Sequence, residues 1–248
     1  MRPSLIVVVT VLNSMLTGSM NLRAQDSVAV TPSPYPPTAR INYVRSWEAV
    51  KPVADPNNLT LSSALSNVRM TTQYLDGLGR PVQTVIKQGS LSSGSLAVDL
   101  VSAQVYDQLG REVRQYLPFA ANNFDGNTSV SDGQFKFNPF DQQQYFYSDN
   151  NALSPIRGQG ETFYYAKTEY EASPLSRPES AYAAGNSWVH EGRGIKHYYL
   201  TNTLADSIRI WKVVNVSDSF GNYTTTNIYP AGKLYKQLTM DEYNRQVI

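Results

Sequence analysis

The sequence predicts a mainly β fold built from repeated antiparallel β-hairpins, with one or two short helices. Three observations support this prediction. Apolar and polar residues alternate with the period of two that is typical of half-buried strands. Tyrosine, a residue favoured in strands, accounts for 17 of the 248 residues. One turn pattern, an Asp placed three residues before a Gly or an Asn, returns four times between strand-like runs.

The first of these turns lies in a hairpin predicted over residues 70–88, and each of its residues has a physical role. Asp76 can accept hydrogen bonds from backbone amides two residues further on. Gly79 can adopt the positive φ that bulky residues resist. Arg80 can reach back to the Asp76 carboxylate while its stem lies along the strand.

The other three copies predict hairpins over residues 100–118, 211–229 and 234–248. Their structural turn residues are Asp107, Gly110 and Arg111, then Asp218 and Gly221, then Asp241 and Asn244. Asn244 replaces the glycine in the last copy, and Asn is the residue that next best tolerates the left-handed region.

Residues 1–24 resemble a signal peptide, because Arg2 precedes an apolar run that is too short to span a membrane. We therefore expect export to the cell surface or beyond, with no integral membrane span after the leader is removed. A buried N-terminal helix is the alternative. Residues 25–40 form a Pro-rich linker that cannot enter a sheet interior and that would tether the domain at residues 41–248.

Composition excludes several classes of function. The chain has no cysteine, which removes disulfides, cysteine nucleophiles and cysteine metal ligands. Its formal net charge of +1 gives no electrostatic reason to expect a nucleic-acid partner, because such a partner favours a basic protein surface. We therefore expect no nucleic-acid partner. Between the second and third turns, residues 138–147 predict a two-turn helix capped by Asp141, and residues 163–170 predict a strand.

Candidate catalytic residues are few, and we expect no enzymatic activity, no cofactor and no metal site. A zinc site would need both histidines, His190 and His197, together with distant carboxylates. A glycosidase pair would have to come from carboxylates whose separation the sequence does not give, namely Glu161, Glu169 and Glu171. No Gly-x-Ser-x-Gly motif is present to mark a serine nucleophile.

Two binding interpretations remain open beside their structural alternatives. The oxygen-rich segment 122–132 either binds calcium or is a plain loop, and its oxygen-bearing residues are Asn122, Asn123, Asp125, Asn127 and Asp132. Several aromatic residues either stack on sugar rings or pack within the sheet, namely Tyr145, Tyr147, Tyr164, Tyr165, Trp188, Tyr198 and Tyr199.

Two motifs, Tyr74-x-Asp76-x-x-Gly79-Arg80 and Tyr106-Asp107-x-x-Gly110-Arg111, resemble the YD repeats of Rhs and teneurin-type proteins. A wider series of segments from Ile41 onward resembles the uncharacterised domain at the N-terminus of RHS-repeat proteins in Bacteroidetes. It includes Asn42–Trp47, Tyr116–Phe119, Phe137–Phe140, Glu171–Arg177, Gly185–Trp188 and Asp206–Trp211.

The resemblance implies that the chain begins a large β-shell, which in related proteins often encloses a variable C-terminal toxin. It implies a non-catalytic structural segment whose partners are downstream YD repeats of the same or a longer chain. The end at Ile248, just after the fourth turn, leads us to expect the N-terminal part or a truncated copy of a longer repeat protein. The alternative is a self-contained secreted module with a glycan or other cell-surface partner.

Overall fold

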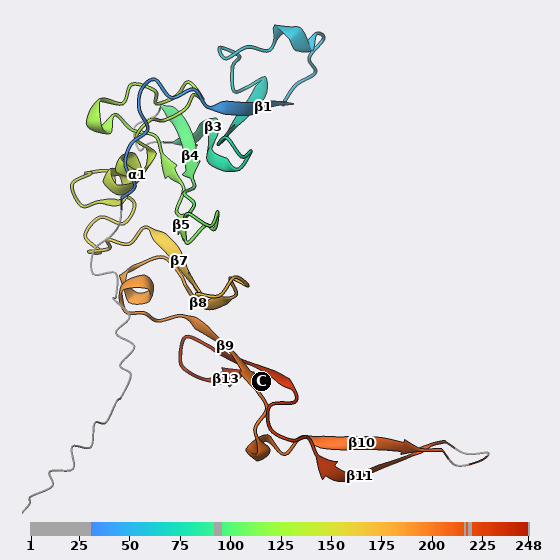
Figure 1. Ribbon diagram of the computed structural model, residues 1–248. Helices are drawn as coiled ribbons and strands as arrows, with labels where there is room; N and C mark the ends of the chain where they lie inside the picture. Colours follow the sequence, from blue (N-terminus) through green and yellow to red (C-terminus); the bar gives the residue numbers. More distant parts are fainter. Residues whose placement is uncertain (1–30, 92–95, 216, 218–219, 248) are drawn as a thin grey trace, which may run out of the picture.

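The computed structural model describes residues 31–91, 96–215, 217 and 220–247, so the expected signal peptide lies outside the described residues. The predicted mainly β fold is confirmed, and every strand pair is antiparallel. Figure 1 shows the strands following one another along an extended array, from β1 at the top to β9 and β13 near the bottom, with α1 on one side. None of the helices in the described residues has the length and apolar character needed to cross a bilayer.

The strands form three sheets. The five-stranded sheet has the order β1 (Asn42–Ala49), β2 (Val68–Leu75), β3 (Pro81–Leu91), β4 (Ala97–Ala103) and β6 (Phe119–Ala120). The six-stranded sheet has the order β13 (Gln246–Val247), β12 (Tyr235–Met240), β9 (Ile195–Thr201), β8 (Pro178–Tyr182), β7 (Tyr165–Tyr170) and β5 (Arg114–Tyr116). The two-stranded sheet pairs β10 (Arg209–Val214) with β11 (Asn222–Ile228).

The segment 100–118 is not a single hairpin as expected. Its first strand, β4, pairs with β3 and β6, whereas its second strand, β5, pairs with β7. A single β-bridge between Gln104 and Gln115 joins the two strands. The turn at Asp107 therefore carries the chain from the five-stranded sheet into the six-stranded sheet, because all three residues of β5 pair with β7.

One α-helix, α1 (Pro139–Tyr147), lies in the long connection between β6 and β7. Asn138 occupies its N-cap position and Asp141 lies within the first turn, so the expected cap at Asp141 is wrong. Pro139 explains the earlier start, because proline fits the first helical turn, where its missing N–H group is not needed. Short helical segments elsewhere are Pro56–Asn58, Phe124–Gly126, Asn186–His190 and Leu204–Asp206.

The main core lies on one face of the five-stranded sheet. On β2 the side chains are buried and exposed in alternation, as the period of a strand requires. Val85, Val101 and Phe119, from three different strands, are almost completely buried. Phe135, from the connection that also carries α1, covers this cluster and makes an edge-to-face ring contact with Tyr74.

A buried ion pair fastens the same connection to the sheet. Asp99 on β4 and Lys136 are both fully buried, and Lys136 Nζ lies 2.7 Å from Asp99 Oδ2. The backbone N–H groups of Gln88 and Gly133 donate to the two oxygens of Asp99. Lys136 Nζ also donates to Ser129 and Asp132, so the buried ammonium group is satisfied in full.

The described part of the Pro-rich segment, residues 31–40, packs on the domain and is not a free tether. The Thr31 hydroxyl donates to Gln144 Oε1 at 2.7 Å. The Tyr35 N–H donates to the carbonyl of Phe137, and the Tyr35 ring packs edge-to-face on Phe135. The prolines thus keep this segment out of the sheet but do not keep it away from the protein surface.

The two-stranded sheet forms an arm, residues 203–233, that projects from the body between β9 and β12 (Figure 1). Apolar side chains on the arm are unusually exposed, including Trp211 at 62% and Tyr223 at 71%. Asn202, which is buried, closes the base of the arm. Its side-chain oxygen accepts hydrogen bonds from the N–H groups of Lys233 and Leu234.

We expect Phe119→Ala to lower the free energy of unfolding by about 3–5 kcal/mol, because it leaves a cavity in the main core. Urea unfolding followed by circular dichroism measures this loss. Leu109→Ala is the matched control, since Leu109 is exposed and should change stability little. Equal effects of the two substitutions would contradict the position of the core.

Candidate functional site

The turn between β2 and β3 is closed by one carboxylate. Asp76 Oδ1 accepts hydrogen bonds from the backbone N–H groups of Leu78 and Arg80 at 2.8 and 2.9 Å. Asp76 Oδ2 accepts a hydrogen bond from Arg80 Nε at 2.8 Å. Gly79 has a φ of 79°, which places it in the left-handed region. The acid, the glycine and the arginine thus act together on one turn.

Two further turns repeat this arrangement almost atom for atom. Asp107 accepts from the N–H groups of Leu109 and Arg111 and from Arg111 Nε, all at 2.8–2.9 Å. Asp241 accepts from Tyr243, Arg245 and Arg245 Nε at 2.7–2.9 Å. Gly110 and Asn244 take the positive φ at 78° and 61°. Asn244 therefore stands structurally where glycine stands in the other turns.

The expected third copy does not share this geometry. Asp218 lies outside the described residues, and Gly221 is not in the left-handed region. A Cβ atom at Gly221 would approach the Val213 side chain to 2.8 Å, so close packing across β10 and β11 accounts for this glycine. β10 pairs with β11 as an antiparallel hairpin, and part of the turn between them, including Asp218, lies outside the described residues.

An additional turn of this family, which the sequence reasoning missed, joins β7 to β8. Glu171 accepts hydrogen bonds from Arg177 Nε at 2.9 Å and from Arg177 Nη2 at 2.8 Å. The Glu171 N–H donates to the Arg177 carbonyl, as the Asp76 N–H donates to that of Arg80. Ser176 takes the positive φ at 47°. Two extra residues and a glutamate in place of the aspartate conceal the pattern in the sequence. The flanking residues are the signal that could have identified it, because Tyr170 precedes the acid as Tyr106 does, and Pro178 follows the arginine as Pro81 does.

Successive turns are linked by stacking of an arginine on a tyrosine. The guanidinium carbon of Arg80 lies 4.3 Å from the ring centroid of Tyr106, which precedes the next acid. The corresponding distances are 4.7 Å from Arg111 to Tyr170 and 4.1 Å from Arg177 to Tyr199. All three are within the range of a cation–π interaction. We call this series the turn ladder, made of Arg80, Tyr106, Arg111, Tyr170, Arg177 and Tyr199.

Two steps of the turn ladder share a second contact. The Tyr106 hydroxyl donates to the carbonyl of Pro81 at 2.8 Å, and the Tyr199 hydroxyl donates to the carbonyl of Pro178 at 3.0 Å. Each proline directly follows the stacked arginine. The tyrosine therefore contacts two consecutive residues of the preceding turn, which fixes its ring over the guanidinium group.

The turn ladder also contacts the residue that carries the positive φ. A Cβ atom at Gly110 would come within 2.8 Å of Arg80 Nη1, so the missing side chain makes room for the preceding arginine. At the equivalent place in the next turn, Ser176 Oγ accepts a hydrogen bond from Arg111 Nη1 at 3.3 Å. One position thus serves both the bend of its own turn and the packing of its neighbour.

Hydrogen bonding favours the ionised form of the four turn acids. For Asp76, Asp107 and Asp241, the backbone N–H of the following arginine is the main cause that lowers the pKa of the carboxyl group. For Glu171, the hydrogen bonds from the Arg177 side chain lower the pKa to about 2 from an ordinary value of 4.5. All four turns are therefore closed by a carboxylate at neutral pH.

The comparison with protein families gives one match. Residues 45–201 match the model of a family described as Domain of unknown function (DUF6443), and this range covers more than half of the chain. The chain belongs to the DUF6443 family. No curated protein and no solved structure matches it. The matched DUF6443 range contains the turns at Asp76, Asp107 and Glu171 and ends before the arm.

The other candidate residues serve mainly structural roles. Asn122 and Asn127 use their side-chain amides to bind backbone groups of the same loop. No group of three or more His, Asp or Glu residues suited to a metal ion occurs among the described residues. His190 stacks on Phe163, and His197 is hydrogen-bonded to Thr239.

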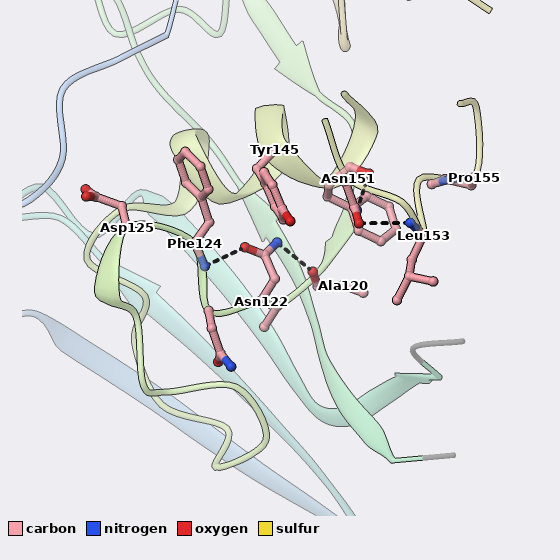
Figure 2. Close-up of a pocket in the computed structure, with 11 residues that line it drawn as sticks. Ala120, Asn122, Phe124, Asp125, Tyr145, Asn151, Leu153 and Pro155 are labelled. Atoms are coloured by element: carbon pink, nitrogen blue, oxygen red, sulfur yellow. Dashed lines mark hydrogen bonds between the residues drawn. The ribbon is translucent and has the colours of Figure 1, made fainter. Parts of the chain in front are cut away.

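The aromatic residues considered for sugar binding separate into different environments. Tyr165 and Tyr164 are buried, and Tyr147 stacks on Tyr164. Tyr199 belongs to the turn ladder. Tyr145 lies apart from these, because it lines a surface pocket of about 610 Å³ beside the Phe124 turn (Figure 2).

We expect the stabilising effect of Glu171 to depend on pH in an acidic window. Because its pKa is lowered on folding, the ionised form stabilises the protein above pH 4.5, and this contribution is lost as the pH falls toward about 2. Unfolding midpoints of the wild type and Glu171→Gln should therefore differ at pH 7 and converge in this window. Glu48→Gln, on the exposed strand β1, is the control. A constant difference across the window would contradict the assignment.

A pair of glycine substitutions isolates the turn ladder. Gly79 and Gly110 have the same φ, but only Gly110 adjoins an arginine of the preceding turn. Each substitution to Ala should cost about 1 kcal/mol for the left-handed backbone. Gly110→Ala should lower the free energy of unfolding by about 0.5–1 kcal/mol more, because Arg80 must move off the Tyr106 ring. Equal costs in urea unfolding would show that the stack does not stabilise the protein.

Proposed function

We propose that this chain is a non-catalytic structural segment of an exported RHS/YD-repeat protein and that it begins a β-shell continued by downstream YD repeats. The turn ladder is the observation that carries the proposal. In each step, the arginine of one turn meets a tyrosine supplied by the strand pair that follows. The turns at Asp76, Asp107 and Glu171 thus each present a contact to the strands that follow, which is the property that a repeat array requires.

The last turn supports continuation of the array. Arg245 closes its own turn through Asp241, but 72% of its side chain is exposed. Within the described residues, β13 lies at the edge of the six-stranded sheet and pairs with β12. Tyr235 on β12 is 98% exposed. A following strand with an aromatic residue would cover this end of the sheet in the manner of the earlier steps.

The remaining parts of the proposal come from the sequence. The leader at residues 1–24 supports export, and the resemblance to YD repeats supports a place in a polymorphic-toxin or cell-surface protein. The four turn acids are held by backbone groups and arginines, which supports a structural role for them. Both oxygens of each carboxylate accept hydrogen bonds within the turn that it closes.

Glycan binding is a second candidate function, which the pocket beside Tyr145 favours. It joins aromatic rings with polar side chains at the protein surface, as sugar-binding sites do. This function is compatible with the first, because the pocket lies on the connection that carries α1 and away from the turn ladder.

The native protein tests the structural proposal directly. We expect its intact mass, measured on material recovered from the producing cells and medium, to be several-fold above 27.6 kDa, with the leader removed. Such a mass would mean that this segment begins a longer array. A mass just below that value would contradict the proposal and would make a self-contained binding module the better account.

A further inference from the structure

The pocket shown in Figure 2 is formed by three pieces of the long connection between β6 and β7. The turn at Phe124, the helix α1 and the loop at residues 151–155 surround it, and Ala120 and Ala121 form part of its lining. The two alanines are buried and small, which leaves about 610 Å³ of space above them. This volume is within the range of small-molecule sites.

One side of the pocket is a flat aromatic surface. The rings of Phe124 and Tyr145 are stacked, with centroids 4.7 Å apart and an angle of 17° between their planes. Phe124 remains 41% exposed although its ring is large and apolar. Tyr145 covers one face of Phe124, and the other face offers a platform to a ligand with a flat apolar face, whereas a cage for a cation needs rings set at angles around it.

The platform is held in a fixed position by amide side chains. The Phe124 N–H donates to Asn122 Oδ1, and Asn138 Nδ2 donates to the Phe124 carbonyl. Asn122 in turn donates to the carbonyl of Ala120 (Figure 2) and to that of Gln142. These bonds tie the turn to β6 and to α1. The ring is therefore preorganised, which reduces the entropy that binding would cost.

The polar groups of the pocket are neutral or negative. Among the described residues that line it, none is Lys, Arg or His, and Asp125 is the single charged residue. Asp125 lies on the side of Phe124 opposite Tyr145, at the rim. The Tyr145 hydroxyl is directed away from Asp125, toward Asn122 and Ala120 (Figure 2). Such a site disfavours anionic ligands, and the Asp125 carboxylate can accept hydrogen bonds from a neutral polar ligand.

We propose that this pocket binds a neutral sugar ring, such as the terminal residue of a glycan. The apolar C–H face of a pyranose would lie on the face of Phe124 that Tyr145 does not cover, and its hydroxyl groups would donate to the Asp125 carboxylate on the same side. This assignment rests on the second candidate function and adds to it the position of the site and the charge class of the ligand. It does not depend on the turn ladder.

Saturation-transfer NMR on the full chain tests the assignment. The probes are the neutral methyl pyranosides of glucose, galactose, mannose and N-acetylglucosamine, with glucuronic acid and choline as charged probes. At least one neutral pyranoside should give a saturable signal. Phe124→Ala should weaken it about tenfold, the equivalent of one lost ring contact. Tyr145→Phe, which keeps the ring, should weaken it less. Tyr223→Phe, on the exposed surface of the arm, should leave it unchanged.

Each other outcome has a defined meaning. Saturable sugar binding that survives Phe124→Ala would overturn this site but would leave glycan binding in place elsewhere. No saturable signal from any neutral pyranoside would overturn both the site and the second candidate function. Saturation by choline that is lost in Phe124→Ala would identify an ammonium site and overturn the sugar assignment. Circular dichroism of each variant verifies that the fold is retained.

Discussion

The hydrogen bonding of a carboxylate to the backbone of its own turn is the interaction on which the rest of the structure depends. It satisfies amide groups that a tight bend would otherwise leave without partners, and it holds an arginine beside the strand that follows. The arginine, once fixed, can stack on a tyrosine of the next strand pair. Local closure of a turn and contact between neighbouring hairpins thus come from the same three residues, exemplified by Asp76, Gly79 and Arg80.

The turn ladder continues with similar arginine–tyrosine distances even where the strand pairing changes. Between β4 and β5, backbone pairing is reduced to the single bridge of Gln104 and Gln115. The turn at Asp107 nevertheless has the same internal hydrogen bonds as the turn at Asp76. Side-chain stacking at the turns therefore joins two sheets that backbone pairing alone joins weakly. The buried pair of Asp99 and Lys136 adds a second fastening by holding the connection with α1 to the first sheet.

Local patterns in the sequence predicted the local structures and failed where distant residues decide. The mainly β fold follows from alternation and turn residues, because both act over a few positions. The turn at Glu171 was missed since two inserted residues hide a geometry that the backbone restores. The partner of β5 is β7, separated from it by some fifty residues, and no short pattern encodes such a pairing. The pocket at Phe124 likewise arises only when three separate pieces of the connection between β6 and β7 fold against one another.

The closed base of the arm has a consequence for how this chain can vary. Asn202 binds Lys233 and Leu234 directly, and β9 pairs with β12 along six residues, so the two strands are held together at the base of the arm. The entropy of closing a loop rises only slowly with its length, so the sheet is nearly indifferent to the size of this insertion. The base of the arm is therefore expected to act as an insertion site, at which segments of different length and sequence can replace one another while β9 and β12 keep their register.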